Sequence, residues 1–192
     1  MERGPLIMVT GGARSGKSRL AEELAAAGGG RVVYLATAVI GDDEMAARVA
    51  AHRRRRPPGW LTVEAPLTVT EALAREGKRA DTILLDSMGM WINNLLGGLQ
   101  QGGASDGGED HDVVIENIMN LVRKLVVTAW EVPARVIIVT EETGLGLVPP
   151  YPLGRLFRDL LGLANQEIAS RADRVYLVMA GLPLILKDLL SE

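Results

Sequence analysis

The sequence predicts an α/β fold, in which a mostly parallel β-sheet is covered by helices on both faces. Short apolar runs alternate with longer segments of helical propensity along the whole chain of 192 residues. Most of these runs are apolar throughout, which is typical of strands buried on both faces of a parallel sheet. The sequence has no internal repeat and no sign of a second domain, so we expect one domain over residues 1–192.

The expected strands are short apolar runs bounded by glycine, proline or charged residues. The first ends in the glycines Gly11 and Gly12, and the second is apolar from Val32 to Leu35. In chain order, the expected strands are Leu6–Thr10, Arg31–Thr37, Leu61–Glu64, Thr82–Asp86, Arg135–Thr140 and Arg174–Met179.

The expected helices fill the gaps between these strands. The first stops at the glycines 28–30, and the second is capped by Asp42 and Asp43 and cannot continue through Pro57 and Pro58. In chain order, the expected helices are Ser18–Ala27, Asp43 to about Arg55, Leu67–Arg75, Met88–Leu96, Asp112–Trp130 and Leu153–Ala172. The glycine-rich, acidic stretch at about 97–110 is expected to be a flexible surface loop between two helices.

Composition excludes several classes of protein. The net charge of −3 and the pI near 5.5 argue against a surface that coats nucleic acid. Without cysteine, the chain has neither disulfides nor thiolate metal sites. The first apolar run is too short for a signal-peptide core, and no run approaches the roughly 18 apolar residues of a membrane span. We therefore expect a cytoplasmic protein that does not bind nucleic acid and has no membrane span.

The stretch GGARSGKS, residues 11–18, fits the phosphate-binding pattern G-x-x-x-x-G-K-[ST]. Its glycines let the backbone wrap around a phosphate, and the positive end of the following helix dipole adds to the attraction. Lys17 is placed to reach the terminal phosphates, and the hydroxyl of Ser18 is suited to bind Mg²⁺. Because an expected strand precedes the loop and an expected helix follows it, we predict a P-loop NTPase-like (RecA-like) domain.

The apolar run Ile83–Asp86 ends in a carboxylate, that of Asp86. An acid at this point resembles a Walker-B aspartate, which would make Asp86 a partner of Ser18 in holding Mg²⁺. The alternative is an ordinary aspartate that caps the next helix.

Of the two histidines, His111 is expected to be solvated, whereas His52 has informative neighbours. Glu44, Arg48 and His52 share one stripe of a helix, and further arginines follow. Arginine would hold phosphate oxygens and lower the pKa of the imidazole, which would leave a neutral nitrogen free to attack phosphorus. A solvated basic helix end accounts for the residues equally well, and a nucleic-acid patch is the weaker third interpretation.

Together these segments resemble the bifunctional adenosylcobinamide kinase / adenosylcobinamide-phosphate guanylyltransferase family of cobalamin biosynthesis. The similarity runs from about residue 6 to residue 187, and it is carried by GGARSGKS, YLATA, DDEMAARVAAHRRRRPPGW, LLDSMGMWINNLL, LGLVPPYPLGRLFRDLLGLANQ and VYLVMAGLPLILK. The resemblance implies two reactions. A nucleoside triphosphate (ATP or GTP) phosphorylates adenosylcobinamide, and GMP is then transferred from GTP to that phosphate through a covalent GMP-histidine, here His52. It also implies a homotrimer.

The resemblance extends to the nucleotide contacts. The positions that match are Gly11, Gly12, Ala13, Arg14, Ser15, Gly16, Lys17, Ser18, Ala36, Thr37, Ala38, Arg53, Arg54, Arg55, Arg56, Glu64 and Asp86. The carboxylate of Glu64 is suited to pair with the N1–H and N2–H groups of guanine. The family usually has Thr-Asn-Glu-Val-Gly where this chain has residues 140–144, so Glu141 adds a negative charge near the expected ligand loop.

The late segment 144–159 joins a turn-rich loop to a helix with charged and aromatic residues, at an edge of the sheet where α/β proteins bind ligands. It is expected to face the corrinoid substrate or a neighbouring subunit, or else to be a plain surface loop and amphipathic helix. Two other functions stay open for the chain: a small-molecule P-loop kinase without a covalent intermediate, and a non-enzymatic GTP-binding regulator.

Overall fold

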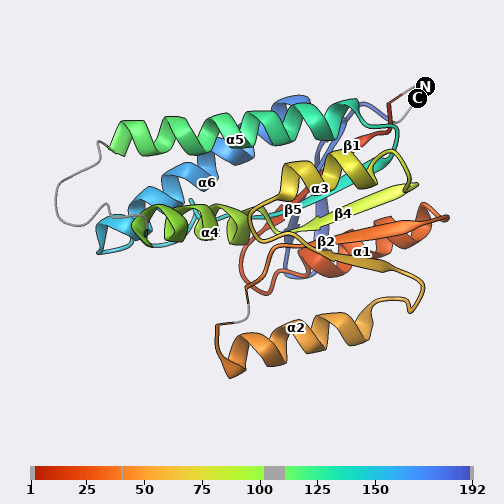
Figure 1. The fold of residues 1–192 in the computed structure, drawn as a ribbon, viewed down its shortest axis with the longest axis horizontal. Helices are drawn as coiled ribbons and strands as arrows, with labels where there is room; N and C mark the ends of the chain where they lie inside the picture. The colour runs from red at the N-terminus through yellow and green to blue at the C-terminus, as the bar shows by residue number, and fades with distance from the viewer. Residues whose placement is uncertain (1–2, 40, 102–110, 191–192) are drawn as a thin grey trace.

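The computed structural model describes residues 3–39, 41–101 and 111–190, and all statements below concern these residues. A seven-stranded sheet in the order β3-β2-β4-β5-β1-β6-β7 forms the centre of the molecule (Figure 1). The strands are β1 (Leu6–Gly11), β2 (Val32–Ala36), β3 (Leu61–Glu64), β4 (Thr82–Asp86), β5 (Arg135–Glu141), β6 (Arg174–Met179) and β7 (Leu182–Asp188). Neighbouring strands are parallel except β6 and β7, which are antiparallel. The predicted α/β class with a mostly parallel sheet is therefore confirmed.

Helices cover both faces of this sheet (Figure 1). They are α1 (Lys17–Ala27), α2 (Asp43–Arg55), α3 (Val69–Glu76), α4 (Met88–Gln101), α5 (His111–Glu131) and α6 (Pro152–Arg171). Alternate residues of β1 enter different cores: Leu6 and Met8 pack on the side of α3 to α6, while Ile7 and Val9 pack on the side of α1. This division explains why the strand reads as continuously apolar.

Helix α2 stands apart from the sheet (Figure 1), and none of its described side chains is fully buried. Its start follows the prediction, since Asp42 Oδ1 accepts a hydrogen bond from Met45 N at 2.7 Å. The helix ends at Arg55, because Arg56 is extended and two prolines follow.

Two expectations were wrong. Strand β7 was not predicted, because its apolar run contains Pro183 and most of its side chains are exposed at the sheet edge. The loop was expected to begin at residue 97, but Gly97 and Gly98 are helical and α4 continues to Gln101. Residues 102–110 lie outside the described residues. The remaining element ends differ from the prediction by one or two residues, as is usual at frayed ends.

Among the helices of the described chain, none is both long enough and apolar enough to cross a bilayer.

Candidate active site

The loop after β1 has the shape of a phosphate cradle. Strand β1 ends at Gly11 and α1 begins at Lys17, which gives the strand–loop–helix context that the sequence predicted. Gly16 has φ +99°, a left-handed conformation that favours glycine, and directly precedes the helix. Lys17 Nζ donates to the carbonyl oxygen of Gly12 at 3.3 Å, so the lysine folds back over the loop. Cation, backbone amides and helix terminus thus converge on one point.

The β6–β7 turn braces this cradle from behind. Gly181 N donates to the carbonyl oxygen of Ser15 at 2.9 Å. A Cβ on Gly11 would lie 2.5 Å from the carbonyl oxygen of Val178, so only glycine fits there. The hydroxyl of Ser15 is buried and has no hydrogen-bond partner among the described residues. A buried polar atom without a partner is costly, which fits a loop that is completed by a polar ligand.

Asp86 ends β4 at the same edge of the sheet, as predicted. Its Oδ2 accepts a hydrogen bond from the hydroxyl of Tyr34 at 2.9 Å. Burial, reinforced by the charge of Asp86, raises the pKa of Tyr34, so the phenol stays a neutral donor. The guanidinium of Arg56 lies over the Tyr34 ring at 3.2 Å from its centroid. Tyr34 therefore links the end of α2 to the carboxylate.

Glu141 ends β5, where it pairs in register with Gly11. Its Oε2 accepts a hydrogen bond from Gly89 N at 3.2 Å. Burial raises the pKa of the Glu141 carboxyl, although the positive charge of Lys17 opposes this shift. The departure from the family pattern thus places a carboxyl group in the electrostatic field of the P-loop lysine.

The structure does not place His52 in the cradle. Its Nδ1 lies 3.9 Å from Glu22 Oε1 on α1, and its side chain is 37% exposed. Glu22 follows Lys17 by five residues, about 7.5 Å along a helix that rises 1.5 Å per residue. His52 therefore faces the second turn of α1. His111, at the start of α5, is exposed as expected.

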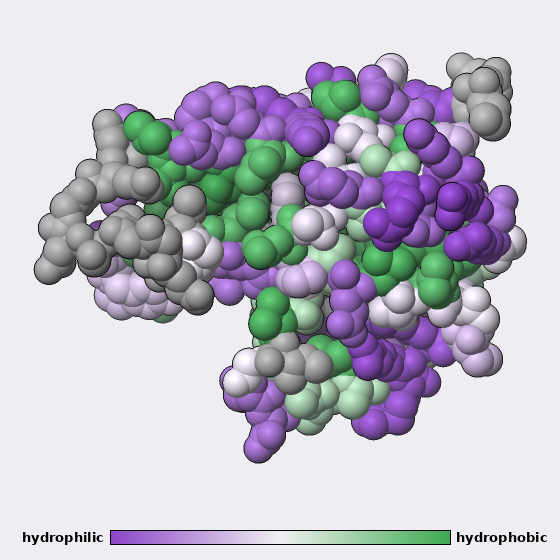
Figure 2. Space-filling model, viewed as in Figure 1, coloured by the Kyte–Doolittle hydropathy of each residue, from purple (hydrophilic) through white to green (hydrophobic). Residues whose placement is uncertain are grey.

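The arginines after His52 have different surroundings. Arg53 forms an ion pair with Glu64 at the end of edge strand β3, and Arg56 donates to Thr62 Oγ1 at 3.4 Å. Arg54 is exposed, and the side chain of Arg55 lies outside the described part of the structure. Figure 2 shows a hydrophilic surface over this end of α2.

Thr37, one of the predicted nucleotide contacts at 36–38, is hydrogen-bonded to the residue that follows Asp86. Its hydroxyl donates to the carbonyl oxygen of Ser87 and accepts from Ser87 N, both at 2.9 Å. Ala36 ends β2 in register with Asp86. The pair Thr37–Ser87 therefore fixes the ends of two neighbouring strands at the edge that carries the site.

Sequence reasoning missed Tyr34 and Glu22. Tyr34 is the polar side chain within the apolar run of β2, and this was the available signal. Glu22 looked like an ordinary charge on an exposed helix face, and nothing in its spacing from His52 along the chain relates the two. Both acquire significance from contacts at the C-terminal end of α2, where His52 lies near Glu22 and Arg56 lies over Tyr34.

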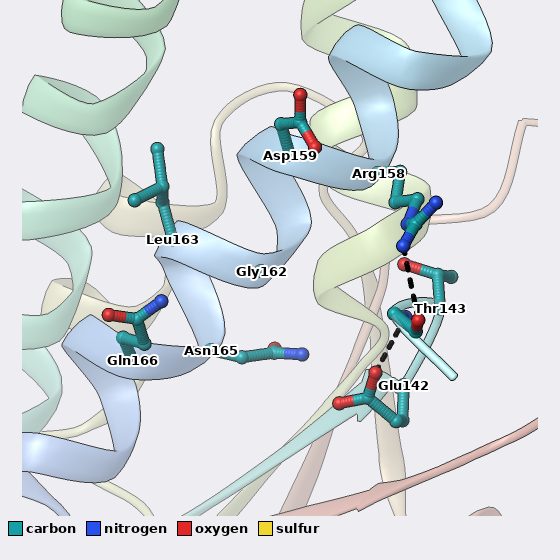
Figure 3. Close-up of a pocket in the computed structure, with 9 residues that line it drawn as sticks. Glu142, Thr143, Arg158, Asp159, Gly162, Leu163, Asn165 and Gln166 are labelled. Atoms are coloured by element: carbon teal, nitrogen blue, oxygen red, sulfur yellow. Dashed lines mark hydrogen bonds between the residues drawn. The ribbon is translucent and has the colours of Figure 1, made fainter. Parts of the chain in front are cut away.

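A cavity of about 420 Å³ opens between the loop after β5 and α6 (Figure 3). It is lined by Glu142, Thr143, Gly144, Arg158, Asp159, Gly162, Leu163, Asn165 and Gln166. Asn165 fixes the strand end beneath it, since its Oδ1 accepts from Thr140 Oγ1 at 2.6 Å and its Nδ2 donates to the carbonyl oxygen of Glu141 at 3.0 Å. The loop and helix of the late segment thus meet at the ligand-binding edge of the sheet.

Comparison with known proteins gives a consistent result. The family described as cobinamide kinase / cobinamide phosphate guanyltransferase matches residues 7–186. The bifunctional adenosylcobalamin biosynthesis protein CobP of Pseudomonas aeruginosa is 42% identical over 94% of this chain and 96% of its own. The CobU proteins of the same description from Escherichia coli K12 and Salmonella typhimurium LT2 are each 40% identical over 95% of this chain and 99% of their own.

Solved structures confirm the fold class. The type III secretion ATPase EscN of enteropathogenic E. coli matches with a TM-score of 0.54 at 15% identity, over 92% of this chain and 43% of its own. A prototypical type III secretion ATPase of pathogenic bacteria matches with a TM-score of 0.56 at 14% identity, over 95% of this chain and 57% of its own. Both likenesses concern the fold alone, and they agree with the predicted P-loop NTPase-like (RecA-like) domain.

Proposed function

The chain belongs to the cobinamide kinase / cobinamide phosphate guanyltransferase family, and from this premise we propose how its residues carry out two reactions. It is an enzyme that phosphorylates cobinamide and then transfers a guanylyl group to the cobinamide phosphate. The observation that carries the assignment is the family match over residues 7–186 together with a formed P-loop at the carboxyl edge of the sheet.

In the kinase step, the terminal hydroxyl of the aminopropanol arm of adenosylcobinamide attacks the γ-phosphorus of ATP or GTP. The bond between the γ-phosphorus and the oxygen that bridges it to the β-phosphorus breaks, and the nucleoside diphosphate leaves. Lys17 and the loop amides of residues 11–18 stabilise the negative charge that develops on the phosphate oxygens. Support comes from the lysine folded over the loop and from the unpartnered hydroxyl of Ser15.

In the transfer step, a ring nitrogen of His52 attacks the α-phosphorus of GTP, and pyrophosphate leaves from the P-loop. The phosphate of adenosylcobinamide phosphate then displaces the histidine, which gives adenosylcobinamide-GDP. The carboxylate of Glu22 lies 3.9 Å from Nδ1, so its negative charge would favour a proton on that nitrogen and leave Nε2 as the nucleophile. In attack, Nε2 and phosphorus must approach to about 3–3.5 Å. Since His52 faces the second turn of α1, either the α-phosphate extends along α1 or α2 shifts towards the loop.

Ser18 and Asp86 are the residues that we propose to hold Mg²⁺. The oxygen donors fit this ion, and Tyr34 occupies only one carboxylate oxygen of Asp86. Among the described residues there is no cluster of three or more carboxylate or histidine ligands, which agrees with an ion held mostly by nucleotide phosphates and water. When bound, Mg²⁺ would neutralise charge on the phosphates.

For guanine selection we propose Glu64, whose carboxylate matches the N1–H and N2–H donors of the base. In the structure this carboxylate is paired with Arg53, so a bound base would have to share or displace that arginine. Glu64→Gln is expected to weaken the use of GTP in the transfer step but not the use of a purine nucleotide that lacks N2. An equal loss for both nucleotides would contradict this role.

We propose that the protein forms a homotrimer and acts in the cytoplasm, where its nucleoside triphosphate substrates are available. Strand β7 supports subunit contact, because it is an edge strand with exposed Leu184, Ile185 and Leu186. Sedimentation equilibrium measures the subunit number directly.

The deciding experiment is covalent labelling with GTP that carries ³²P at the α-phosphorus. Incubation with Mg²⁺ followed by denaturation should leave acid-labile, base-stable label on the protein. The label should disappear in His52→Ala and persist in His111→Ala, which is a matched control because the chain has only two histidines. Turnover with adenosylcobinamide but no label would favour a kinase without a covalent intermediate. GTP binding without any turnover would favour a non-enzymatic regulator.

A further inference from the structure

We propose that the cavity between the loop after β5 and α6 binds carboxamide side chains of the corrinoid acceptor, an inference that rests on the proposed function. The volume of about 420 Å³ lies within the roughly 300–1,000 Å³ of small-molecule pockets. It suits side chains at the edge of a corrin macrocycle, while the macrocycle itself would lie outside.

The lining supplies both donors and acceptors of hydrogen bonds. The guanidinium of Arg158 carries five N–H groups, and its contact within the described chain is one hydrogen bond to the carbonyl oxygen of Gly144 at 3.1 Å. Glu142 Oε1 accepts from Gly144 N at 2.6 Å, and the carboxylate remains at the cavity wall (Figure 3). A primary carboxamide has a carbonyl acceptor and an NH₂ donor, so it can bond to a guanidinium and a carboxylate at once.

The charge of the lining argues for a neutral ligand. Glu142 and Asp159 are the acidic residues of the lining, and Arg158 is its cation. In Figure 3, Asp159 projects from the other side of the α6 turn from Arg158. Because the lining as a whole carries two carboxylates and one cation, a phosphate monoester would be attracted less here than at the P-loop. We therefore place the phosphorylated arm of the acceptor at the P-loop and its carboxamides in the cavity.

The segment that follows the cavity loop is apolar and exposed. Leu145, Leu147 and Val148 follow the cavity loop directly and are 79%, 97% and 63% exposed. Arg155 Nη1 holds this loop by donating to the carbonyl oxygens of Pro149 and Pro150 at 3.2 and 2.8 Å. A fixed loop that presents three apolar side chains to solvent within four residues indicates a binding surface. A macrocycle with carboxamide arms matches this combination of an apolar loop and a polar cavity.

The cavity also lies within reach of the phosphate cradle. Glu142 N donates to the carbonyl oxygen of Gly11 at 3.1 Å, so the cavity loop is bonded directly to the first residue of the P-loop. The preceding Glu141 lies in the field of Lys17. An acceptor seated on the cavity rim could therefore extend its arm to the transferring phosphorus without crossing the protein.

The test is calorimetric titration of cobinamide into the full chain in the presence of a non-hydrolysable GTP analogue. Arg158→Gln should weaken cobinamide binding about tenfold or more, since hydrogen bonds from a charged group are lost. Leu147→Ser, at an exposed position that cannot disturb folding, should weaken it about threefold or more. Arg171→Gln on the same helix and Leu121→Ser, another exposed leucine, are the matched controls and should bind as the wild type does. Affinity for the GTP analogue should not change in any of the four.

The possible failures can be told apart. If both Arg158→Gln and Leu147→Ser bind cobinamide with wild-type affinity, this inference is overturned and the proposed function stays intact. A wild-type chain that binds the GTP analogue but not cobinamide would overturn the proposed function together with the inference. Sedimentation of Leu147→Ser gives the third outcome: a changed subunit number would assign the loop to a subunit contact and refute the acceptor site.

Discussion

Replacing Tyr34 by phenylalanine should damage the active site while leaving the fold intact. The ring of Tyr34 is buried against α1 and under the guanidinium of Arg56, and both contacts survive the change. Only the hydroxyl is lost, which donates to Asp86 Oδ2 at 2.9 Å. Because burial raises the pKa of Tyr34, this donor is present at every ordinary pH, and its loss should be equally severe from pH 6 to pH 9.

The size of the effect follows from the kind of bond. A hydrogen bond to a charged group contributes about 1.5–3 kcal/mol, and Asp86 is only half-buried, so we expect the lower end. A loss of about 1.5 kcal/mol corresponds to a fall in Tm of about 3–6 °C for a domain of this size. Residues that orient a metal-binding carboxylate typically account for about 10–100-fold in metal affinity or activity. Guanylyl transfer should fall by the same factor.

The control is Tyr176→Phe, which removes a hydroxyl from the same apolar core. That hydroxyl accepts from Arg174 Nη1 at 3.4 Å, a long contact worth about 0.5 kcal/mol or less. Thermal unfolding and the initial rate of transfer at several Mg²⁺ concentrations should be measured for both variants. If Tyr34→Phe unfolds and turns over like Tyr176→Phe at every Mg²⁺ concentration, the assignment of Asp86 as a positioned metal ligand is refuted.

Three further predictions concern charge and backbone. Glu141→Gln should stabilise the protein at neutral pH, because burial raises the pKa of this carboxyl in the folded state. In the wild type, stability is therefore lost as the pH rises from about 4 through the raised pKa. Urea unfolding should show a higher free energy of unfolding for the variant at pH 7.5 but not at pH 4. Asp173→Asn should cost about 2–3 kcal/mol, since the buried carboxylate accepts two hydrogen bonds from Arg3 and one from Leu6 N. The hydrogen bonds from Arg3 are the main cause of the lowered pKa of Asp173, so this carboxylate stabilises the fold above about pH 4 and stops doing so in acid. The free energy of unfolding should therefore fall less steeply with decreasing pH in the variant than in the wild type. Gly16→Ala should cost about 1–3 kcal/mol and weaken GTP binding, because φ is +99° at this position; an unchanged Tm and GTP affinity would show that the loop relaxes.

Much of the fold could be read from the sequence because its signals are local. The apolar run of β1, the glycines of the loop and the helical composition of α1 stand in direct succession, so the cradle and its lysine were predictable. Asp86 was found in the same way, as an acid at the end of an apolar run. Strand β7 escaped because an exposed edge strand with a proline lacks the pattern of a buried one.

The environment of these residues required the folded chain. Tyr34 and Asp86 are separated by 52 residues and meet because β2 and β4 are neighbours in the sheet. The cavity likewise combines the loop after the end of β5 with a helix that begins eleven residues after that strand. Periodicity identifies a strand or a helix, but it does not say which strands become neighbours.

The sequence by itself determined the sheet of apolar strands, the P-loop with Lys17 and the carboxylate Asp86, because each depends on residues close together in the chain. The role of His52 as a candidate nucleophile came from the resemblance to the family, since its neighbours alone fitted a solvated helix end equally well. Tertiary structure alone decided that His52 lies against Glu22 on α1, outside the cradle, and that the loop lining the cavity is hydrogen-bonded to the first residue of the P-loop. The physical reason is that strand order and helix placement are set by burial of apolar surface over the whole domain. Such long-range packing fixes the distance between two chemical groups, which no local pattern encodes.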